Sequence, residues 1–312
     1  MVTIVGMAPR LSLGVRAAIA LAAALLTLPV PVHAVRVMPA GAGSVTLVGA
    51  GDIAVCGSNT TDSETAALVS SVLAEQASNV AFTAGDNVYP DGSSSWYNAC
   101  YDPTWGVFKL RTRPVPGNHD YYNNPTGAGY FGYFGSQAGP AGRGWYRYDV
   151  GSWRIYALTS ECVRGSRCYV RQYRWLRADL VNNPHQCVLA IWHQPRFSSG
   201  AGHGSSTNMA PVFSLLYWHG AEIVLSGHDH DYERFAPTDA NGVPVGNGLR
   251  QWVVGTGGAP LYSFASPLPA SEVRDATTHG VLRLDLAAGG YDWQYIPTTT
   301  GGFTDSGSGV CH

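Results

Sequence analysis

The sequence predicts an α/β fold built around a largely parallel sheet. From about residue 45, short apolar runs typical of buried strands alternate with amphipathic segments typical of helices. Five of these apolar runs end directly in polar or ligating side chains. Open α/β sheets bind ligands at the carboxyl ends of their strands, so this position favours a functional site over scattered turn residues.

The elements follow in a regular order. The five polar-ended strands are predicted within residues 44–52, 79–86, 111–120, 186–193 and 221–230. Helices are predicted at 61–76, 171–181 and 210–220, the last stopped by Gly220. Aromatic-rich stretches at 144–160 and 250–258 indicate further strands and leave room for a second sheet. We interpret "GTGGAP", residues 255–260, as a turn after the strand before it, because it lacks the lysine of a P-loop.

Residues 1–34 have the pattern of a cleaved secretory signal peptide. Arg10 and Arg16 precede a short apolar core, and "VHA" places small residues before a cut after Ala34. The alternative is a membrane anchor, but the apolar run is short for a span of about 20 residues. We therefore expect a secreted, periplasmic or cell-surface protein with one catalytic domain at 35–312.

Composition limits the partners. The chain is 45 % apolar and 13 % charged, with a net charge of -2, a composition that suits one large globular domain or two small ones. No interdomain linker is evident in the sequence, which favours a single domain. No charge run suggests nucleic-acid binding, and no membrane association is expected after signal cleavage. Oligomeric state is left open.

Seven potential metal ligands gather at the predicted strand ends. They mix carboxylate, phenol, amide and imidazole groups: Asp52, Asp86, Tyr89, Asn118, His193, His228 and His230. Seven donors are too many for one tetrahedral zinc and suit two ions that share a carboxylate. Asp120 follows His119 directly and could orient a histidine through a hydrogen bond.

In these blocks the sequence resembles the calcineurin-like metallophosphoesterases. It carries "GDIA" at 51–54, "GDNVY" at 85–89, "GNHD" at 117–120, "WHQPRFSSG" at 192–200 and "GHDH" at 227–230, in the order of that superfamily. The resemblance implies a four-layer α/β/β/α sandwich of two mixed sheets.

Two positions point to the purple acid phosphatases, of the small tartrate-resistant type, within that superfamily. Many members place a histidine where this chain has Ala54, whereas purple acid phosphatases supply a tyrosine where it has Tyr89. By this resemblance, Asp52, Asp86, Tyr89 and His230 hold Fe(III). A divalent ion (Fe, Zn or Mn) is then held by Asp86, Asn118, His193 and His228, with Asp86 as the bridge.

The expected function is hydrolysis of phosphate monoesters. Two cations clamp the ester and activate water, and Fe(III) extends this chemistry to acid pH. His119 is the candidate that contacts phosphate and protonates the leaving group, and His203 is a second candidate. A phosphodiesterase or nucleotidase on the same site is the alternative, and a non-catalytic, metal-stabilised surface binding protein is the third reading. We assign specificity to loops 91–105, 121–144 and 196–208.

Six cysteines in an exported chain predict disulfides. We expect Cys162 to pair with Cys168 across a short polar loop. Cys56 would pair with Cys100, which leaves Cys187 with Cys311. This is one of 15 possible pairings. A zinc site is the rival interpretation, but the chain has no CxxC pair.

Overall fold

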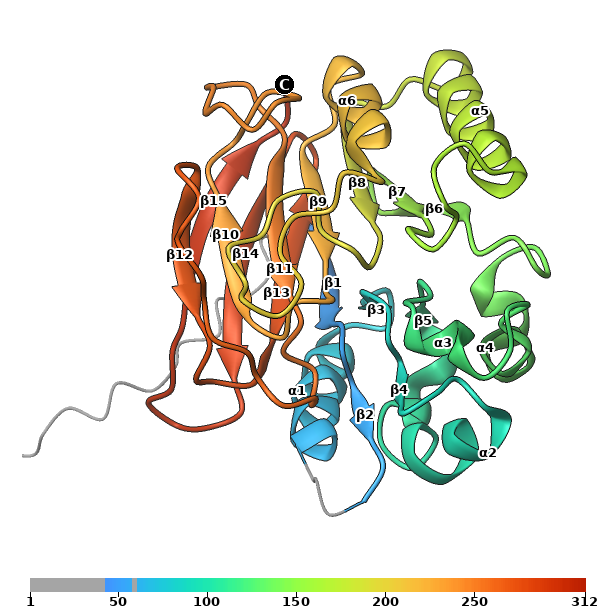
Figure 1. Ribbon diagram of the computed structural model, residues 1–312. Coiled ribbons are helices and arrows are strands. Elements are labelled where there is room, and N and C mark those ends of the chain that lie inside the picture. The colour runs from blue at the N-terminus through green and yellow to red at the C-terminus, as the bar shows by residue number, and fades with distance from the viewer. Residues whose placement is uncertain (1–42, 58–60) are drawn as a thin grey trace, which may run out of the picture. The chain divides into compact units, whose positions relative to one another are not determined.

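Two mixed β-sheets face each other in the computed structural model, which describes residues 43–57 and 61–312. The first sheet has the strand order β15-β14-β13-β1-β3-β5 (Figure 1). Its strands are β1 (Val45–Ala50), β3 (Val80–Thr83), β5 (Thr112–Arg113), β13 (Gly280–Ala287), β14 (Gly290–Pro297) and β15 (Ser306–Val310).

The second sheet has the order β12-β10-β11-β9-β8-β7-β6. Its strands are β6 (Tyr146–Val150), β7 (Trp153–Ala157), β8 (Cys187–Ile191), β9 (Ile223–Ser226), β10 (Tyr232–Phe235), β11 (Arg250–Val254) and β12 (Ser271–Asp275). A small parallel pair, β2 (Ala54–Val55) with β4 (Val88–Tyr89), lies beyond the first sheet.

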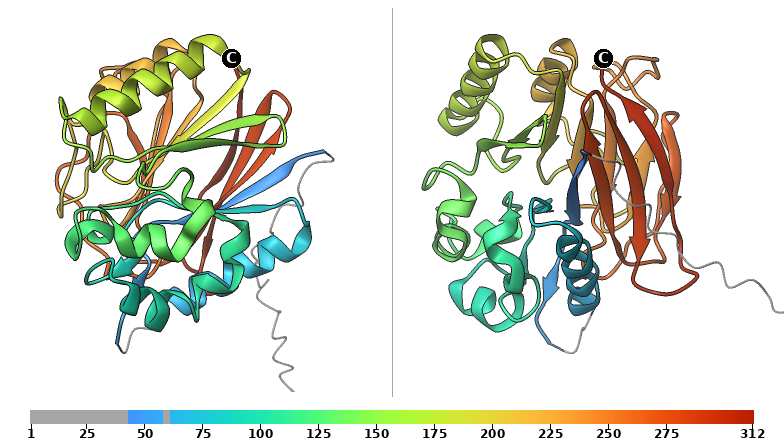
Figure 2. Two further views of the ribbon diagram at one scale, coloured as in Figure 1. Left: turned by 90° about the vertical axis from the view of Figure 1, so that its right-hand side faces the viewer. Right: turned by 180° about the vertical axis from the view of Figure 1, so that it is seen from behind.

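Helices cover the outer faces of the two sheets (Figures 1 and 2). They are α1 (Thr61–Glu75), α2 (Ser94–Trp96), α3 (His119–Tyr122), α4 (Ala128–Phe134), α5 (Arg167–Asn182) and α6 (Ala210–Trp218). Shorter helical turns occur at Tyr97–Tyr101, Trp105–Arg111 and Gly135–Ala138. The predicted α/β/β/α layering is therefore confirmed.

Successive side chains of a strand point to opposite faces of the sheet, so each strand packs against one layer on either face. In β8, Leu189 and Ile191 pack into the core between the sheets, while Val188 and Ala190 pack with α5 and α6. All are buried, and a strand buried on both faces has the continuous apolar run seen in the sequence.

The predicted helices form close to their expected bounds. In α1 the buried side chains include Val69, Val72 and Leu73. Ser166 caps α5 by accepting a hydrogen bond from the backbone N–H of Tyr169 at 3.2 Å. The α6 helix ends before Gly220, which takes the left-handed conformation (φ 67°) that glycine adopts without strain.

One expectation about the sheet needs correction. The five polar-ended strands do not share one parallel sheet, because β1, β3 and β5 belong to the first sheet and β8 and β9 to the second. Antiparallel strands are added to both, for example β13 beside β1. The parallel cores of the two sheets nevertheless point their carboxyl ends at the same site.

All three expected disulfides are present: Cys56–Cys100, Cys162–Cys168 and Cys187–Cys311. No cysteine is free, so the alternative of a cysteine-ligated zinc is excluded. The predicted signal peptide, residues 1–34, lies outside the described residues. Within the described part of the chain, no helix has the length and apolar character needed to cross a bilayer.

Candidate metal centre

The seven predicted ligands meet where the carboxyl ends of the parallel strands of both sheets come together. Asp52 follows β1, Asp86 follows β3, Tyr89 ends β4 and Asn118 precedes α3. From the second sheet, His193 follows β8, and His228 and His230 follow β9. Their distances fall into two overlapping sets.

The first set surrounds the phenol of Tyr89. Its oxygen lies 2.9 Å from Asp52 Oδ1, 3.2 Å from Asp86 Oδ2 and 3.1 Å from His230 Nε2. His230 Nε2 is also 3.3 Å from Asp52 Oδ1. Two carboxylates, a phenol and an imidazole thus converge on one point.

The second set surrounds the imidazole of His193. Its Nε2 lies 3.2 Å from Asp86 Oδ2, 3.2 Å from Asn118 Oδ1 and 3.1 Å from His228 Nδ1. Asp86, His193 and His228 are close enough together to ligate one ion. Asp86 Oδ2 belongs to both sets, which is the position a bridging carboxylate needs.

The hydrogen bonds of the histidines make these sets fit metal ions. His193 Nδ1 faces the carbonyl oxygen of Ala84 at 2.8 Å, and His230 Nδ1 faces that of Pro260 at 2.8 Å. A carbonyl only accepts, so in each neutral ring Nδ1 carries the proton and Nε2 presents a lone pair. Each lone pair then points at other acceptor atoms, an arrangement that a cation stabilises and that backbone carbonyls commonly orient.

The local electrostatics also favour positive charge at the centre. Burial opposes protonation of His193, but the carboxylates of Asp86 and Asp52 outweigh it and raise the His193 pKa well above its usual value. Burial would raise the Asp86 pKa, yet His193 holds it below its usual range. Burial and the nearby rings of His193 and His203 lower the pKa of His228 to about 2, which keeps this imidazole in the neutral form that metals bind.

Backbone strain is concentrated at the same residues. Asp52 (φ 60°), Asp86 (φ 47°) and His228 (φ 72°) are the only residues other than glycine with positive φ in the described segments. Such conformations cost of order 1–3 kcal/mol each and persist where function requires them. Here they turn the side chains from three strand ends toward one point.

The glycines of the blocks leave space for the ligands. A Cβ atom on Gly117 would lie 2.2 Å from Asp86 Oδ1, and one on Gly85 would lie 2.5 Å from His193 Nδ1. Both distances are far below van der Waals contact. The "GD" and "GNHD" glycines are therefore needed for close packing around the centre.

Ala54, two residues after Asp52, offers no donor to the centre. Ala54 is fully buried in β2 and pairs with Val88 of β4. The tyrosine of the first donor set ends that same β4 strand, so the phenol enters the site from the strand beside Ala54.

Asp120 does not orient a histidine, contrary to the sequence-based expectation. Its buried carboxylate accepts hydrogen bonds from Tyr97 Oη (2.6 Å), Asn87 Nδ2 (2.9 Å) and the Gly117 N–H (2.9 Å). Burial, with the charge of Asp86, raises its pKa to about 6. Asp120 therefore fixes the turns that carry Asp86 and Asn118.

His119 lies at the rim of the centre. Its Nδ1 is 2.7 Å from the carbonyl oxygen of Pro90, and its Nε2 is 3.9 Å from Asp86 Oδ2. The His119 side chain is about a quarter exposed. Its ring packs against the ring of Tyr89, with centroids 4.3 Å apart. Nε2 can therefore reach a bound ester from the solvent side.

His203 reaches the opposite rim. Its ring stacks on that of His228, with centroids 3.9 Å apart. Buried Asp229 holds the loop by accepting the His203 N–H at 2.7 Å and the Gly204 N–H at 2.8 Å. The structure thus brings both proposed catalytic histidines to the centre.

Two tyrosines at the site were not identified from the sequence. Tyr122 Oη accepts a hydrogen bond from Asn118 Nδ2 at 2.9 Å, which turns the amide oxygen toward His193. Tyr262 stacks on His230 with centroids 4.1 Å apart. Tyr122 lies four residues after Asn118 and could have been inferred from helical spacing, whereas no local motif marks Tyr262.

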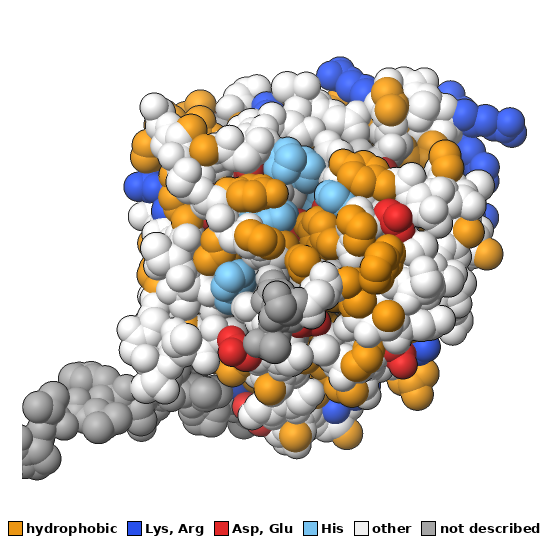
Figure 3. All heavy atoms as spheres, turned by 60° about the horizontal axis from the view of Figure 1, so that its bottom comes forward, with side chains coloured by type: hydrophobic (Ala, Val, Ile, Leu, Met, Phe, Trp, Pro, Cys, Tyr) orange, Lys and Arg blue, Asp and Glu red, His pale blue; other side chains and the backbone are white. Residues whose placement is uncertain are grey.

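A pocket of about 650 Å³ opens beside the centre. Its lining includes Asn118, the aromatic side chains of Tyr121, Tyr122 and Phe131, and Ser166. On the surface, histidines gather next to a patch of hydrophobic side chains (Figure 3). The pocket provides space for the organic part of an ester.

Known proteins with similar sequences include phosphoesterases and acid phosphatases. A family model described as calcineurin-like phosphoesterase matches residues 47–232. Acid phosphatase type 7 of Homo sapiens is 26% identical over 212 residues, 56% of this chain and 46% of that protein. Purple acid phosphatase 21 of Arabidopsis thaliana is 31% identical over 151 residues, 45% of this chain and 34% of that protein.

The fold comparison agrees. A purple acid phosphatase from yellow lupin (Lupinus luteus) seeds superposes with a TM-score of 0.68 at 20% sequence identity, over 87% of this chain and 54% of that chain. The chain thus spans between a third and a half of the length of these curated relatives. The resemblance predicted from the sequence is confirmed, and the chain belongs to the calcineurin-like phosphoesterase family.

Proposed function

We propose that this protein is a secreted, metal-dependent phosphatase that hydrolyses phosphate monoesters at acid pH. The observation that carries the proposal is the shared Asp86 Oδ2, which lies 3.2 Å from both Tyr89 Oη and His193 Nε2. Two donor sets that share one carboxylate fit a dinuclear centre. Similarity to acid and purple acid phosphatases supports the monoester assignment.

In this proposal the two sets hold different ions. Asp52, Asp86, Tyr89 and His230 would bind Fe(III), for which a phenolate oxygen is a suitable hard ligand. Asp86, Asn118, His193 and His228 would bind a divalent ion. Together the ions would stabilise charge on the phosphoryl group and activate water.

The protein's own residues would position the ester and move a proton. His119 Nε2 faces the centre while Nδ1 is held by the Pro90 carbonyl, so the ring can donate to the leaving oxygen from a fixed orientation. His203, on the other rim, would contact the phosphate. The aromatic pocket beside Asn118 would take the organic group.

Replacing His119 by asparagine should lower kcat by about 10²–10⁴-fold, the usual contribution of a general acid. The bound metal content should not change. Steady-state kinetics on a phosphomonoester with metal analysis of the same sample measure both. His219→Asn, at an exposed position after α6, is the matched control and should behave as wild type. Unchanged kcat in His119→Asn would remove the acid role from this residue.

Replacing Tyr89 by phenylalanine should abolish a pink-to-purple colour in the pure protein, because that colour would arise from charge transfer between a phenolate and Fe(III). A visible spectrum of both proteins is the measurement. Tyr122→Phe should keep the colour, since among the described residues that hydroxyl accepts a hydrogen bond from the Asn118 amide and does not contact the Tyr89 phenol. A colourless wild type that is fully active with zinc or manganese alone would contradict the Fe(III) assignment.

We also propose that residues 1–34 are removed on export and that residues 35–312 act as a single catalytic domain. Three disulfides support an oxidising compartment. N-terminal sequencing of the exported protein should give Val35 as the first residue. A retained Met1 would contradict cleavage.

A further inference from the structure

Five arginines without an acidic partner lie on α5 and just before it. They are all exposed, and among the described residues their side chains form no ion pair and no hydrogen bond: Arg164, Arg167, Arg171, Arg174 and Arg177. The whole chain has 19 Lys and Arg residues and a net charge of -2, so this is a strong local concentration of positive charge. We call these five residues the α5 arginine row.

The spacing of the row brings like charges together. Arg167, Arg171, Arg174 and Arg177 are separated by four, three and three residues, so consecutive members are neighbours on one side of the helix. Like charges at this spacing destabilise a helix. The one acid on α5, Asp179, instead pairs with Arg147 at 3.4 Å. A bound polyanion would remove the repulsion that the fold leaves in place.

The topology connects the row to the metal centre. Strands β7 and β8 are parallel neighbours, and α5 is the crossover between them. The helix therefore starts at the carboxyl end of β7, the same edge at which His193 follows β8. The pocket beside Asn118 extends to Ser166 and Cys168, on either side of Arg167 in the chain.

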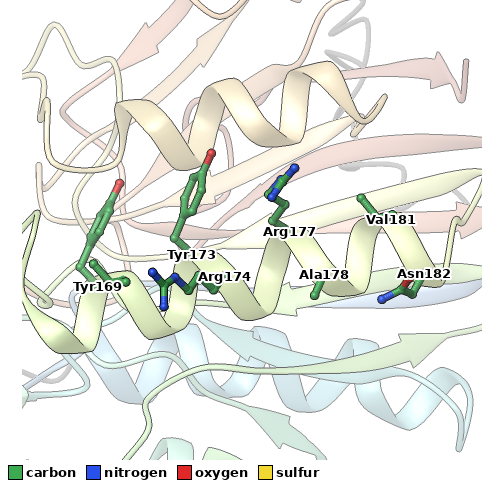
Figure 4. A pocket seen from close by; sticks show the side chains of 8 residues that line it. Tyr169, Tyr173, Arg174, Arg177, Ala178, Val181 and Asn182 are labelled. Atoms are coloured by element: carbon green, nitrogen blue, oxygen red, sulfur yellow. The ribbon is translucent and has the colours of Figure 1, made fainter.

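A separate groove lies along α5, and its first lining residue, Tyr169, follows Cys168 of that pocket in the chain. It has a volume of about 580 Å³ and is lined by residues that include Tyr169, Tyr173, Arg174 and Arg177. Tyr173 and Arg177 project in one direction from the helix and Arg174 in another (Figure 4). Two cationic side chains, Arg174 and Arg177, thus line the groove.

We propose that the α5 arginine row is a docking surface for linear inorganic polyphosphate. Arg167 and Arg177 are ten residues apart, which corresponds to about 15 Å along the helix. A polyphosphate chain carries negative charge on every unit, so it can satisfy several guanidinium groups over this length. Arginine suits this partner because its planar fork binds phosphate oxygens in pairs.

The terminal phosphate of the docked chain would reach the metal centre through the pocket, a step that rests on the proposed function. Hydrolysis there forms a bond from a water oxygen to the terminal phosphorus and breaks the bond to the bridging oxygen. One proton of the water passes to the leaving chain, and the other stays on the released orthophosphate. The products are orthophosphate and a chain shorter by one unit.

The structure favours polyphosphate over two other polyanions. The apolar side of α5, with Leu176 and Leu180, is buried in the protein, and the exposed Val181 lies apart near the end of the helix, so the described helix presents no continuous apolar face to a bilayer. The ring of Tyr169 is buried and stacks on Tyr173 with centroids 6.4 Å apart. It therefore offers no open platform on which nucleic-acid bases could stack.

The test is calorimetric titration of the full-length protein with long-chain inorganic polyphosphate, which needs no turnover. Wild type should bind, and binding should weaken as salt is raised. The double variant Arg171→Gln/Arg174→Gln should bind at least about tenfold more weakly, since it removes two charge-assisted contacts. Glutamine keeps helix propensity, and thermal melts would show that both proteins are folded.

The matched control removes the same charge elsewhere. Lys109→Gln/Arg113→Gln removes two positive charges outside the α5 arginine row, from the helical turn Trp105–Arg111 and from β5, and should bind polyphosphate as wild type does. Equal weakening in both doubles would overturn the docking surface. Tighter binding of wild type to phosphatidylglycerol vesicles or to oligothymidylate than to polyphosphate would overturn the choice of partner. Absence of phosphomonoesterase activity would refute the proposed function and leave the binding result standing.

Discussion

Asp86→Asn is expected to reduce kcat/KM for a phosphomonoester by roughly a thousandfold and to lower the metal content of the protein. Asp86 Oδ2 contacts both Tyr89 Oη and His193 Nε2, so one substitution weakens both donor sets. Loss of metal-based charge stabilisation of about 4 kcal/mol corresponds to this factor. Steady-state kinetics and elemental analysis of the purified variant are the measurements.

Asparagine is chosen because it separates charge from conformation. Asp86 has φ 47°, and asparagine tolerates this region better than alanine. Its side-chain oxygen can still accept the His119 N–H that Asp86 Oδ1 accepts at 2.8 Å. Asp91→Asn, in the same segment, should keep full activity and metal. A folded Asp86→Asn protein with normal activity and two metals would contradict the bridging role.

The largest stability effect is expected from removing the Cys187–Cys311 disulfide. It closes a loop of 124 residues, and in the chain-entropy treatment the double Cys→Ser variant loses about 5 kcal/mol of unfolding free energy. Cys187 is buried in β8, and Cys311 follows β15, the outer strand of the other sheet. The disulfide therefore links the segment after β15 of the first sheet to β8 of the second sheet. Denaturant unfolding of the oxidised proteins measures the change.

The Cys162–Cys168 disulfide is the internal control. Its sequence separation is only 6, and the same treatment gives a loss of about 2 kcal/mol. The double Cys→Ser variant at this pair should therefore be clearly more stable than the variant at Cys187 and Cys311. An equal loss in the two variants would show that loop closure is not the main source of stabilisation.

Much of the site could be predicted because the ligands follow local patterns. Most donors lie at or just after an apolar run, and within each sheet the parallel strands bring their carboxyl ends together whatever the loops between them do. The Asp86–Tyr89 pair and the "GHDH" histidines are each within three residues of one another, so one turn positions both members. These residues could therefore be predicted from local sequence, without knowing which distant segments are in contact.

The remainder depends on contacts between distant segments. Strand β1 pairs with β13, where Thr46 Oγ1 donates to Asp285 Oδ1 across 239 residues, and no local pattern specifies that partner. Tyr262 meets His230 only because the turn after β11 packs on the centre. Position next to His119 suggests that Asp120 orients a histidine, but the fold places Tyr97 against its carboxylate instead.

Net charge does not show where charges gather on the surface. The chain has no run of like charges in sequence and a net charge of -2, yet the α5 arginine row, spaced three and four residues apart, forms no ion pair among the described residues. Summed charge bears on solubility and long-range fields, whereas binding depends on where charges gather. The sequence predicts the helix itself. Whether its exposed arginines are paired with acids can be seen only in the structure.

The central claim is that one carboxylate bridges two metal ions, and anomalous diffraction from crystals of the protein purified with its native metals tests it most directly. The account predicts two anomalous peaks, one among Asp52, Tyr89 and His230 and the other among Asn118, His193 and His228, with Asp86 between them. A single peak, or two peaks of which Asp86 contacts only one, would contradict it.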